Sequence, residues 1–159
     1  MAEYSFVTRW SFRAPIERVW EKIADAERWP SWWKYVKRVE VLDAGGTDGV
    51  GRLLRMTWRT RLPYSLSFDI KSVRVDPPTY MEGQAQGELV GSGIWRLRQV
   101  GDVTDVRYDW EVRTTKFWMN LLAPLARPIF AWNHEGVMQA GEDGLRRILE
   151  NDASPWPRR

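Results

Sequence analysis

The strongest pattern in the chain is an alternation of apolar and polar residues, which predicts seven β-strands. In the last of these stretches Val106, Tyr108, Trp110 and Val112 alternate with charged residues. A change of parity at residues 72–73 predicts a β-bulge in the fourth stretch. Glycine and proline clusters between the stretches favour short connections and antiparallel neighbours. The predicted strands cover residues 3–13, 36–42, 51–61, 64–75, 79–89, 94–100 and 103–115.

Two short helices are predicted between the first and second strands. The first opens at Ala14-Pro15, where proline suits the first turn of a helix, and ends near Asp25. The second is a helical turn at residues 31–35, bounded by Pro30. The chain is therefore expected to begin with a strand and two helices before the other six strands follow.

A long helix is predicted at the end of the chain, over residues 117–149. Pro124 and Pro128 are expected to kink or break its first part, so the continuous helix is expected from about residue 128. Glycine in a helix costs about 1 kcal/mol, so the glycines in this helix are expected to permit close packing. The predicted inward stripe consists of Leu121, Leu125, Ile129, Trp132, Gly136, Ala140, Gly144 and Ile148.

The predicted elements assemble into one α+β domain over residues 1–150. Each strand has a single apolar face, which is typical of one antiparallel sheet whose concave face is covered by a helix. The long helix is the element that can cover it, since about 20 residues span a small domain. Residues 151–159 are polar and contain proline, and they are expected to form a flexible tail.

Composition excludes several classes of protein. The 159 residues include no cysteine and one histidine, so neither a disulfide framework, a metal site nor a cofactor is expected. No signal peptide and no run of 18 apolar residues is found, and a cytoplasmic location is expected. The net charge is +3, and the arginines of the outer sheet face lie among acidic residues on the side opposite to the aromatics. Nucleic acid is therefore not an expected partner.

The order of elements resembles the helix-grip fold of the START-like (SRPBCC) superfamily, and in particular its polyketide cyclase/dehydrase-like branch. The resemblance is carried by the opening strand with Ala14-Pro15-Ile16-Glu17-Arg18-Val19-Trp20, by Trp29-Pro30-Ser31-Trp32-Trp33, and by Trp132-Asn133-His134-Glu135 leading to Gly141-Glu142-Asp143-Gly144-Leu145. It implies a cavity between the sheet and the long helix. The superfamily includes cyclases, aromatases, lipid and quinone carriers, hormone receptors and chaperone activators, so function must be argued from the site.

The residues expected to contact a ligand are mainly aromatic, the usual composition of a small-molecule site. The small residues Gly83, Ala85 and Gly87 of the fifth strand are expected to leave room for it. Core packing without a cavity is the alternative for each aromatic residue. The predicted ligand-binding set is Arg52, Met56, Trp58, Phe68, Tyr108, Trp110, Leu121, Leu125 and Trp132.

Three residues are candidates for chemistry. Arg52 has the parity of the inward residues, and an inward guanidinium would need a ligand carboxylate, phenolate or enolate as its partner. The alternative is that Arg52 lies at the strand end, in solvent or paired with Asp48 or a glutamate. Tyr108 could donate a hydrogen bond to a ligand oxygen. His134, the one histidine, has a pKa suited to acid–base work, although a structural role is the alternative.

These observations leave three functions open. The first is binding of a small hydrophobic molecule, aromatic or polycyclic, in the cavity. The second is a polyketide cyclase or dehydratase, in which Arg52 and a tyrosine would orient an enolate. The third is a lipid or quinone carrier that contacts membranes through Phe117, Trp118 and residues 121–125. The oligomeric state, the ligand and the presence of any enzymatic activity are left open.

Overall fold

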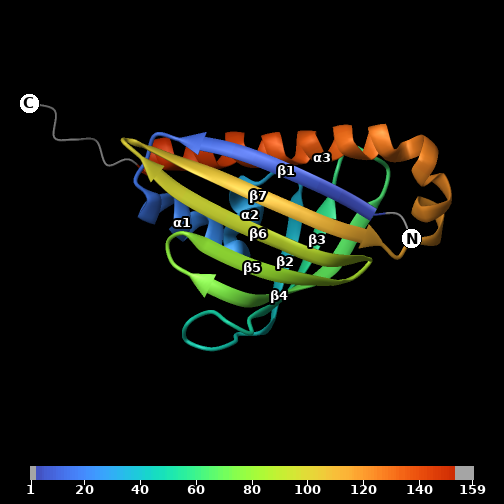
Figure 1. Ribbon diagram of the computed structural model, residues 1–159, viewed down its shortest axis with the longest axis horizontal. Coiled ribbons are helices and arrows are strands. Elements are labelled where there is room, and N and C mark those ends of the chain that lie inside the picture. The colour runs from blue at the N-terminus through green and yellow to red at the C-terminus, as the bar shows by residue number, and fades with distance from the viewer. Residues whose placement is uncertain (1–2, 153–159) are drawn as a thin grey trace, which may run out of the picture.

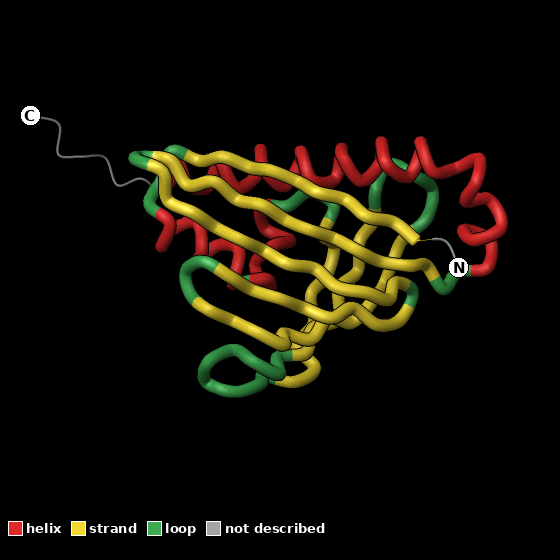
Figure 2. The backbone as a smooth tube through the Cα atoms, in the orientation of Figure 1, coloured by secondary structure: helices red, strands yellow, loops and turns green. Residues whose placement is uncertain are grey.

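The computed structural model describes residues 3–152 and contains one curved antiparallel sheet of seven strands in the order β1-β7-β6-β5-β4-β3-β2. The long helix α3 lies along the sheet (Figures 1 and 2). The α+β architecture predicted from the pattern of residues is confirmed, and so is the helix-grip fold that the family resemblance implies. The strands are β1 (Glu3–Phe12), β2 (Val36–Asp43), β3 (Leu53–Arg59), β4 (Ser65–Asp76), β5 (Tyr80–Gly87), β6 (Leu89–Val100) and β7 (Val103–Thr114).

The helices between β1 and β2 are α1 (Ile16–Ala24), a short 3₁₀ turn η1 (Ala26–Arg28) and α2 (Trp29–Trp32). Pro30 lies inside the first turn of α2 rather than in front of the helix. The predicted start after Pro30 is therefore wrong, because a proline in the first turn removes only an amide that has no partner within the helix.

Helix α3 (Phe117–Asp152) is continuous through both prolines. Its first turns run at an angle to the remainder (Figures 1 and 2), so the predicted kink is present. The prediction that continuous helix starts only near residue 128 is wrong. Asn151 and Asp152 belong to α3 rather than to the predicted tail, and the remainder of that tail, residues 153–159, lies outside the described residues.

Strand β6 is longer than the predicted strand over residues 94–100. Gly91 and Gly93 lie within it, and only Glu88 separates it from β5. A Cβ atom at Gly93 would lie 2.6 Å from the hydroxyl of Tyr108 and 2.9 Å from the ring of Trp110. Gly93 thus leaves room for two large rings of the neighbouring strand to lie over β6. In the sequence alone, a glycine needed for such close packing cannot be told apart from a glycine of a turn. The bulge predicted near residues 72–73 is confirmed by a register shift between Ser72 and Arg74 in the pairing of β4 with β5.

Tryptophans form much of the core. Trp33, which is 1% exposed, has its ring centroid 5.4 Å from that of Trp10, 5.1 Å from Trp29 and 5.0 Å from Trp58. Its indole Nε1 donates a hydrogen bond to the carbonyl oxygen of Val137, at 2.8 Å. Trp33 therefore joins the sheet, the short helices and α3 at one buried point.

The second half of α3 approaches α2 through positions without side chains. A Cβ atom at Gly144 would overlap the carbonyl oxygen of Trp32, and one at Gly141 would lie 2.5 Å from the ring of Trp33. The predicted close packing is present at Gly144, whereas Gly136 lies beside the flexible end of Arg61. This contact holds the long helix against α2 and fixes which side of the helix faces inward.

Candidate ligand-binding cavity

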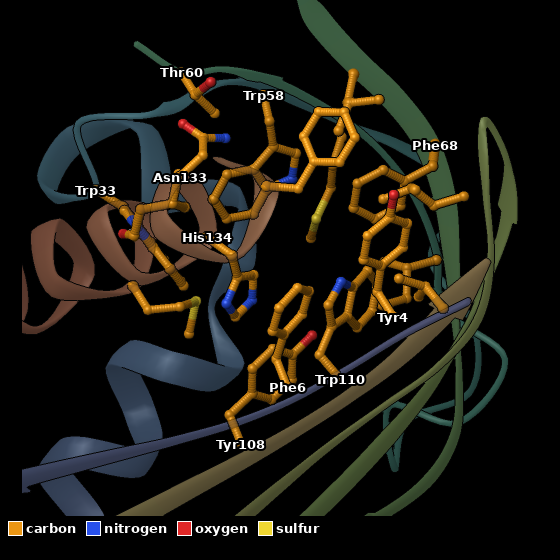
Figure 3. A pocket seen from close by; sticks show the side chains of 18 of the residues that line it. Tyr4, Phe6, Trp33, Trp58, Thr60, Phe68, Tyr108, Trp110, Asn133 and His134 are labelled. Carbon is orange, nitrogen blue, oxygen red and sulfur yellow. The ribbon is translucent and has the colours of Figure 1, made fainter. Parts of the chain in front are cut away.

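A cavity of about 150 Å³ lies between the concave face of the sheet and α3. Figure 3 shows side chains from the sheet and from α3 converging on it. Phe6 comes from β1, Trp58 from β3, Phe68 from β4, and Tyr108 and Trp110 from β7. Because side chains alternate between the two faces of a strand, each of these strands contributes every second residue to the lining.

Five residues of the predicted ligand-binding set line this cavity: Met56, Trp58, Phe68, Tyr108 and Trp110. Their alternation with polar residues placed them on the concave face, and the structure places them there. Their contact with a ligand remains a prediction.

Three other residues of that set lie on the outer face of α3. Leu121 is 67% exposed, Leu125 84% and Trp132 51%, so their predicted place in the cavity is wrong. Positions four apart rotate by about 40° around a helix. The stripe that reaches the inner face at Gly144 therefore starts on the outer face at Leu121.

Arg52 also lies outside the cavity lining. It precedes β3 and forms an ion pair with Glu27 of η1, with 22% of its side chain exposed. The inward position expected from its parity is wrong because the residue lies beyond the strand, where η1 supplies a carboxylate. The structure agrees with the alternative stated from the sequence, in which Arg52 lies at the strand end and pairs with a glutamate.

The small residues of β5 do not form the cavity. A Cβ atom at Gly83 would lie 2.9 Å from Ile70, so the space above this glycine is already filled by a side chain of β4. Neither Gly83, Ala85 nor Gly87 belongs to the lining. The expectation that they leave room for a ligand is wrong, because larger residues of the adjacent strand lie across them.

His134 and Tyr108 line the cavity as uncharged groups. The imidazole of His134 stacks on Phe6, with ring centroids 4.1 Å apart and planes 12° apart. Burial lowers the pKa of His134 from 6.5 to about 4. Tyr108 stacks on Trp95 at 4.1 Å, and burial raises the pKa of its hydroxyl. Near neutral pH the imidazole can accept a hydrogen bond and the phenol can donate one, and neither carries a charge.

Among the described residues, none of those that line the cavity is Asp, Glu, Lys or Arg. It does contain three buried polar atoms without a hydrogen-bond partner: the Tyr4 hydroxyl, Trp58 Nε1 and Asn133 Oδ1. A buried polar atom left unpaired costs about 1–3 kcal/mol, so these three atoms leave hydrogen-bonding capacity unused among the lining residues. Within residues 3–152 no cluster of three His, Asp or Glu residues could hold a metal ion.

Asn133 and Tyr4 are site residues that the sequence analysis did not identify. The alternation in β1 places Tyr4 inward but does not distinguish core from cavity. Asn133 is 7% exposed in the structure. An asparagine on the apolar inner face of a helix would have been a signal of a polar site. The predicted stripe put the wrong side of α3 inward, so Asn133 was not placed on that face.

Comparison with known proteins gives a match over residues 4–150 to the family described as polyketide cyclase / dehydrase and lipid transport. The chain belongs to this family. The START-like resemblance stated from the sequence is thereby confirmed. A search among curated proteins finds no match.

Several solved structures share the fold at low identity. The Zhui aromatase/cyclase from Streptomyces sp. R1128 is 16% identical with a TM-score of 0.79, over 97% of this chain and 98% of that one. A START superfamily protein from Mycobacterium smegmatis is 16% identical with a TM-score of 0.75, over 92% and 97%. The di-domain ARO/CYC BexL is 16% identical with a TM-score of 0.72, over 96% of this chain and 51% of that chain.

Among the described residues of this family member, no helix combines the length and the apolar character needed to cross a membrane.

Proposed function

We propose that the chain binds one neutral, largely aromatic small molecule that carries a single hydrogen-bonding group. The observation that carries this proposal is the cavity of about 150 Å³, whose lining within residues 3–152 has no charged residue but three unpaired polar atoms. The family and its aromatase/cyclase neighbours support a role with a hydrophobic small molecule.

The missing charge selects against ionised ligands. A carboxylate transferred into this cavity would lose its water without gaining a cation, which is costly. Arg52, the candidate cation, is paired with Glu27 outside the lining. A neutral hydroxyl, in contrast, needs no counter-ion and can pair with either Trp58 Nε1–H or Asn133 Oδ1, both of which lack a partner.

The volume supports a ligand built on one aromatic ring. An apolar cavity of roughly 150 Å³ holds a molecule the size of benzene. Larger polycyclic ligands would require side chains of the lining to move.

A matched ligand series tests the proposal by isothermal titration calorimetry at pH 7.5. We expect 4-ethylphenol to bind most tightly. Ethylbenzene should bind roughly tenfold more weakly, because it leaves the polar atoms unpaired, and 4-ethylbenzoate should bind at least tenfold more weakly, since its charge is unpaired. Absence of binding by both neutral compounds, or equal binding by the benzoate, would contradict the proposal.

Asn133→Leu tests the polar contact directly. The leucine keeps the approximate shape and removes a buried oxygen without a partner, so the ligand-free protein should gain about 1–2 kcal/mol of unfolding free energy. The preference for 4-ethylphenol over ethylbenzene should fall to near one. Asn120→Leu on the same helix is the control: Asn120 Nδ2 donates to the Thr114 carbonyl at 3.1 Å, so this variant should lose stability. Unchanged ligand preference in Asn133→Leu would remove Asn133 from the site.

A cyclase or dehydratase is the second candidate. It is favoured by the proton-donating Tyr108 and the neutral imidazole of His134, which line the same cavity. A chemically altered product, recovered by mass spectrometry after incubation with a linear poly-β-ketone, would distinguish this function from binding alone.

A further inference from the structure

The outer side of the first half of α3 exposes an unusual number of large apolar residues. Among the described residues, seven of the twelve large hydrophobic side chains that are exposed lie on this one segment. Contiguous apolar patches of this kind mark interaction sites on soluble proteins. We call this surface the α3 apolar face; it consists of Phe117, Trp118, Leu121, Leu122, Leu125, Ile129 and Trp132.

The opposite side of the same segment is apolar as well. Met119, Ala123 and Phe130 are buried, and Met119 and Phe130 line the cavity. A helix that is apolar on both sides is typical of one that has an apolar environment on both sides. The sheet supplies one of these environments, and the α3 apolar face requires another.

The charges around the α3 apolar face favour an anionic surface. No Asp or Glu occurs from residue 112 to residue 134, whereas Arg113, Lys116 and Arg127 do. Lys116 pairs with Glu88 at 3.0 Å. Arg127 donates to a backbone carbonyl, and the guanidinium of Arg61 lies 3.8 Å from the ring centroid of Trp132. Neither of these last two contacts neutralises the arginine.

The segment also has the shape and composition of a membrane-contacting element. Its kinked first turns form one end of the molecule (Figures 1 and 2). Trp118 and Trp132 carry an apolar ring with a polar N–H, which suits the boundary between headgroups and acyl chains. Leucine and aromatic residues beside arginine or lysine are typical of helices that lie in that boundary.

We propose that the α3 apolar face docks on a bilayer containing anionic lipid, with its leucines and aromatic rings in the interfacial layer and Arg61 and Arg127 near the lipid phosphates. Docking places the helix segment that closes the cavity at the surface where lipid-soluble molecules reside. The proposal concerns the outer side of α3 and stands whatever molecule the cavity binds.

Vesicle flotation with the full chain tests the proposal. Vesicles of phosphatidylcholine with 30% phosphatidylglycerol should retain the protein, pure phosphatidylcholine should retain less, and added salt should lower retention without abolishing it. Leu121→Gln/Leu125→Gln should lower the partition coefficient at least tenfold. Both leucines are largely exposed, so the thermal unfolding of this variant should match that of the unmodified chain.

Val41→Gln/Leu42→Gln, which changes two exposed apolar residues of β2, is the matched control and should retain full binding. No retention on either vesicle, or equal retention of Leu121→Gln/Leu125→Gln, would overturn the proposal. A dimer in sedimentation velocity that Leu121→Gln/Leu125→Gln converts to a monomer, with no flotation of the original chain, would assign the face to a second copy and would also overturn it.

Discussion

Gly144→Ala is expected to destabilise the protein by about 3 kcal/mol, even though alanine is the better helix former. The new methyl group would overlap the carbonyl oxygen of Trp32 and lie 2.9 Å from its carbonyl carbon. These are backbone atoms of α2, so they cannot turn aside as a side chain can. To remove the overlap, α3 must move away from α2. The hydrogen bond from Trp33 Nε1 to the Val137 carbonyl oxygen joins the same two segments and would be strained by that movement. Urea unfolding followed by tryptophan fluorescence measures the loss.

Gly136→Ala is the matched control for this substitution. The atoms nearest to its methyl group would be those of the guanidinium end of Arg61, which can rotate away. This variant should have unchanged stability or gain up to about 1 kcal/mol from helix propensity. Equal stability of the Gly144→Ala and Gly136→Ala variants would show that α2 and α3 are not held at the observed separation.

Acidification should destabilise the protein through His134. Its pKa is about 4 in the folded chain and 6.5 ordinarily, as burial disfavours the imidazolium. Below pH 6.5 the unfolded chain takes up a proton that the folded chain does not, so the stability present above pH 6.5 falls as the pH approaches 4. A shift of this size corresponds to about 3 kcal/mol. Urea unfolding at pH 7.5, 5.5 and 4.5 should show the decline.

His134→Gln separates this effect from the titration of carboxylates. The variant cannot gain a proton at this position, so its stability should vary much less between pH 7.5 and 4.5 than that of the unmodified chain. If both proteins lose stability in parallel, the acid sensitivity belongs to carboxylates and not to His134.

The strands could be predicted from the sequence because the alternation of apolar and polar residues within one strand determines which side chains share a face. Alternation in β7 sets Tyr108 and Trp110 on one face whatever their neighbours are, and the register with β6 preserves that face. Five cavity residues were found for this reason. The length of β6 could not be predicted, because Gly93 is explained only by the rings of Tyr108 and Trp110 on the next strand.

The phase of α3 and the role of Arg52 depended on information that is not local. A four-residue stripe winds around a long helix, so one anchoring contact, here Gly144 against Trp32, decides which side faces inward. Arg52 acquires its partner from Glu27, 25 residues earlier. Asn133 was missed for the same reason, because the wrong phase of the predicted stripe placed it away from the inner face where the structure buries it.

The pairing of β1 with β7 has a consequence for the order in which the molecule can form. β1 lies at the edge of the sheet with β7 as its neighbour, and Glu3 is opposite Arg113. β2 to β7 can close as successive local hairpins, whereas β1 cannot pair until β7, about 100 residues later, is available. Contacts between such distant segments form slowly, and α3 emerges later still. The aromatic wall of the cavity therefore stays exposed to water until β1, β7 and α3 have come together, and their assembly completes the pocket.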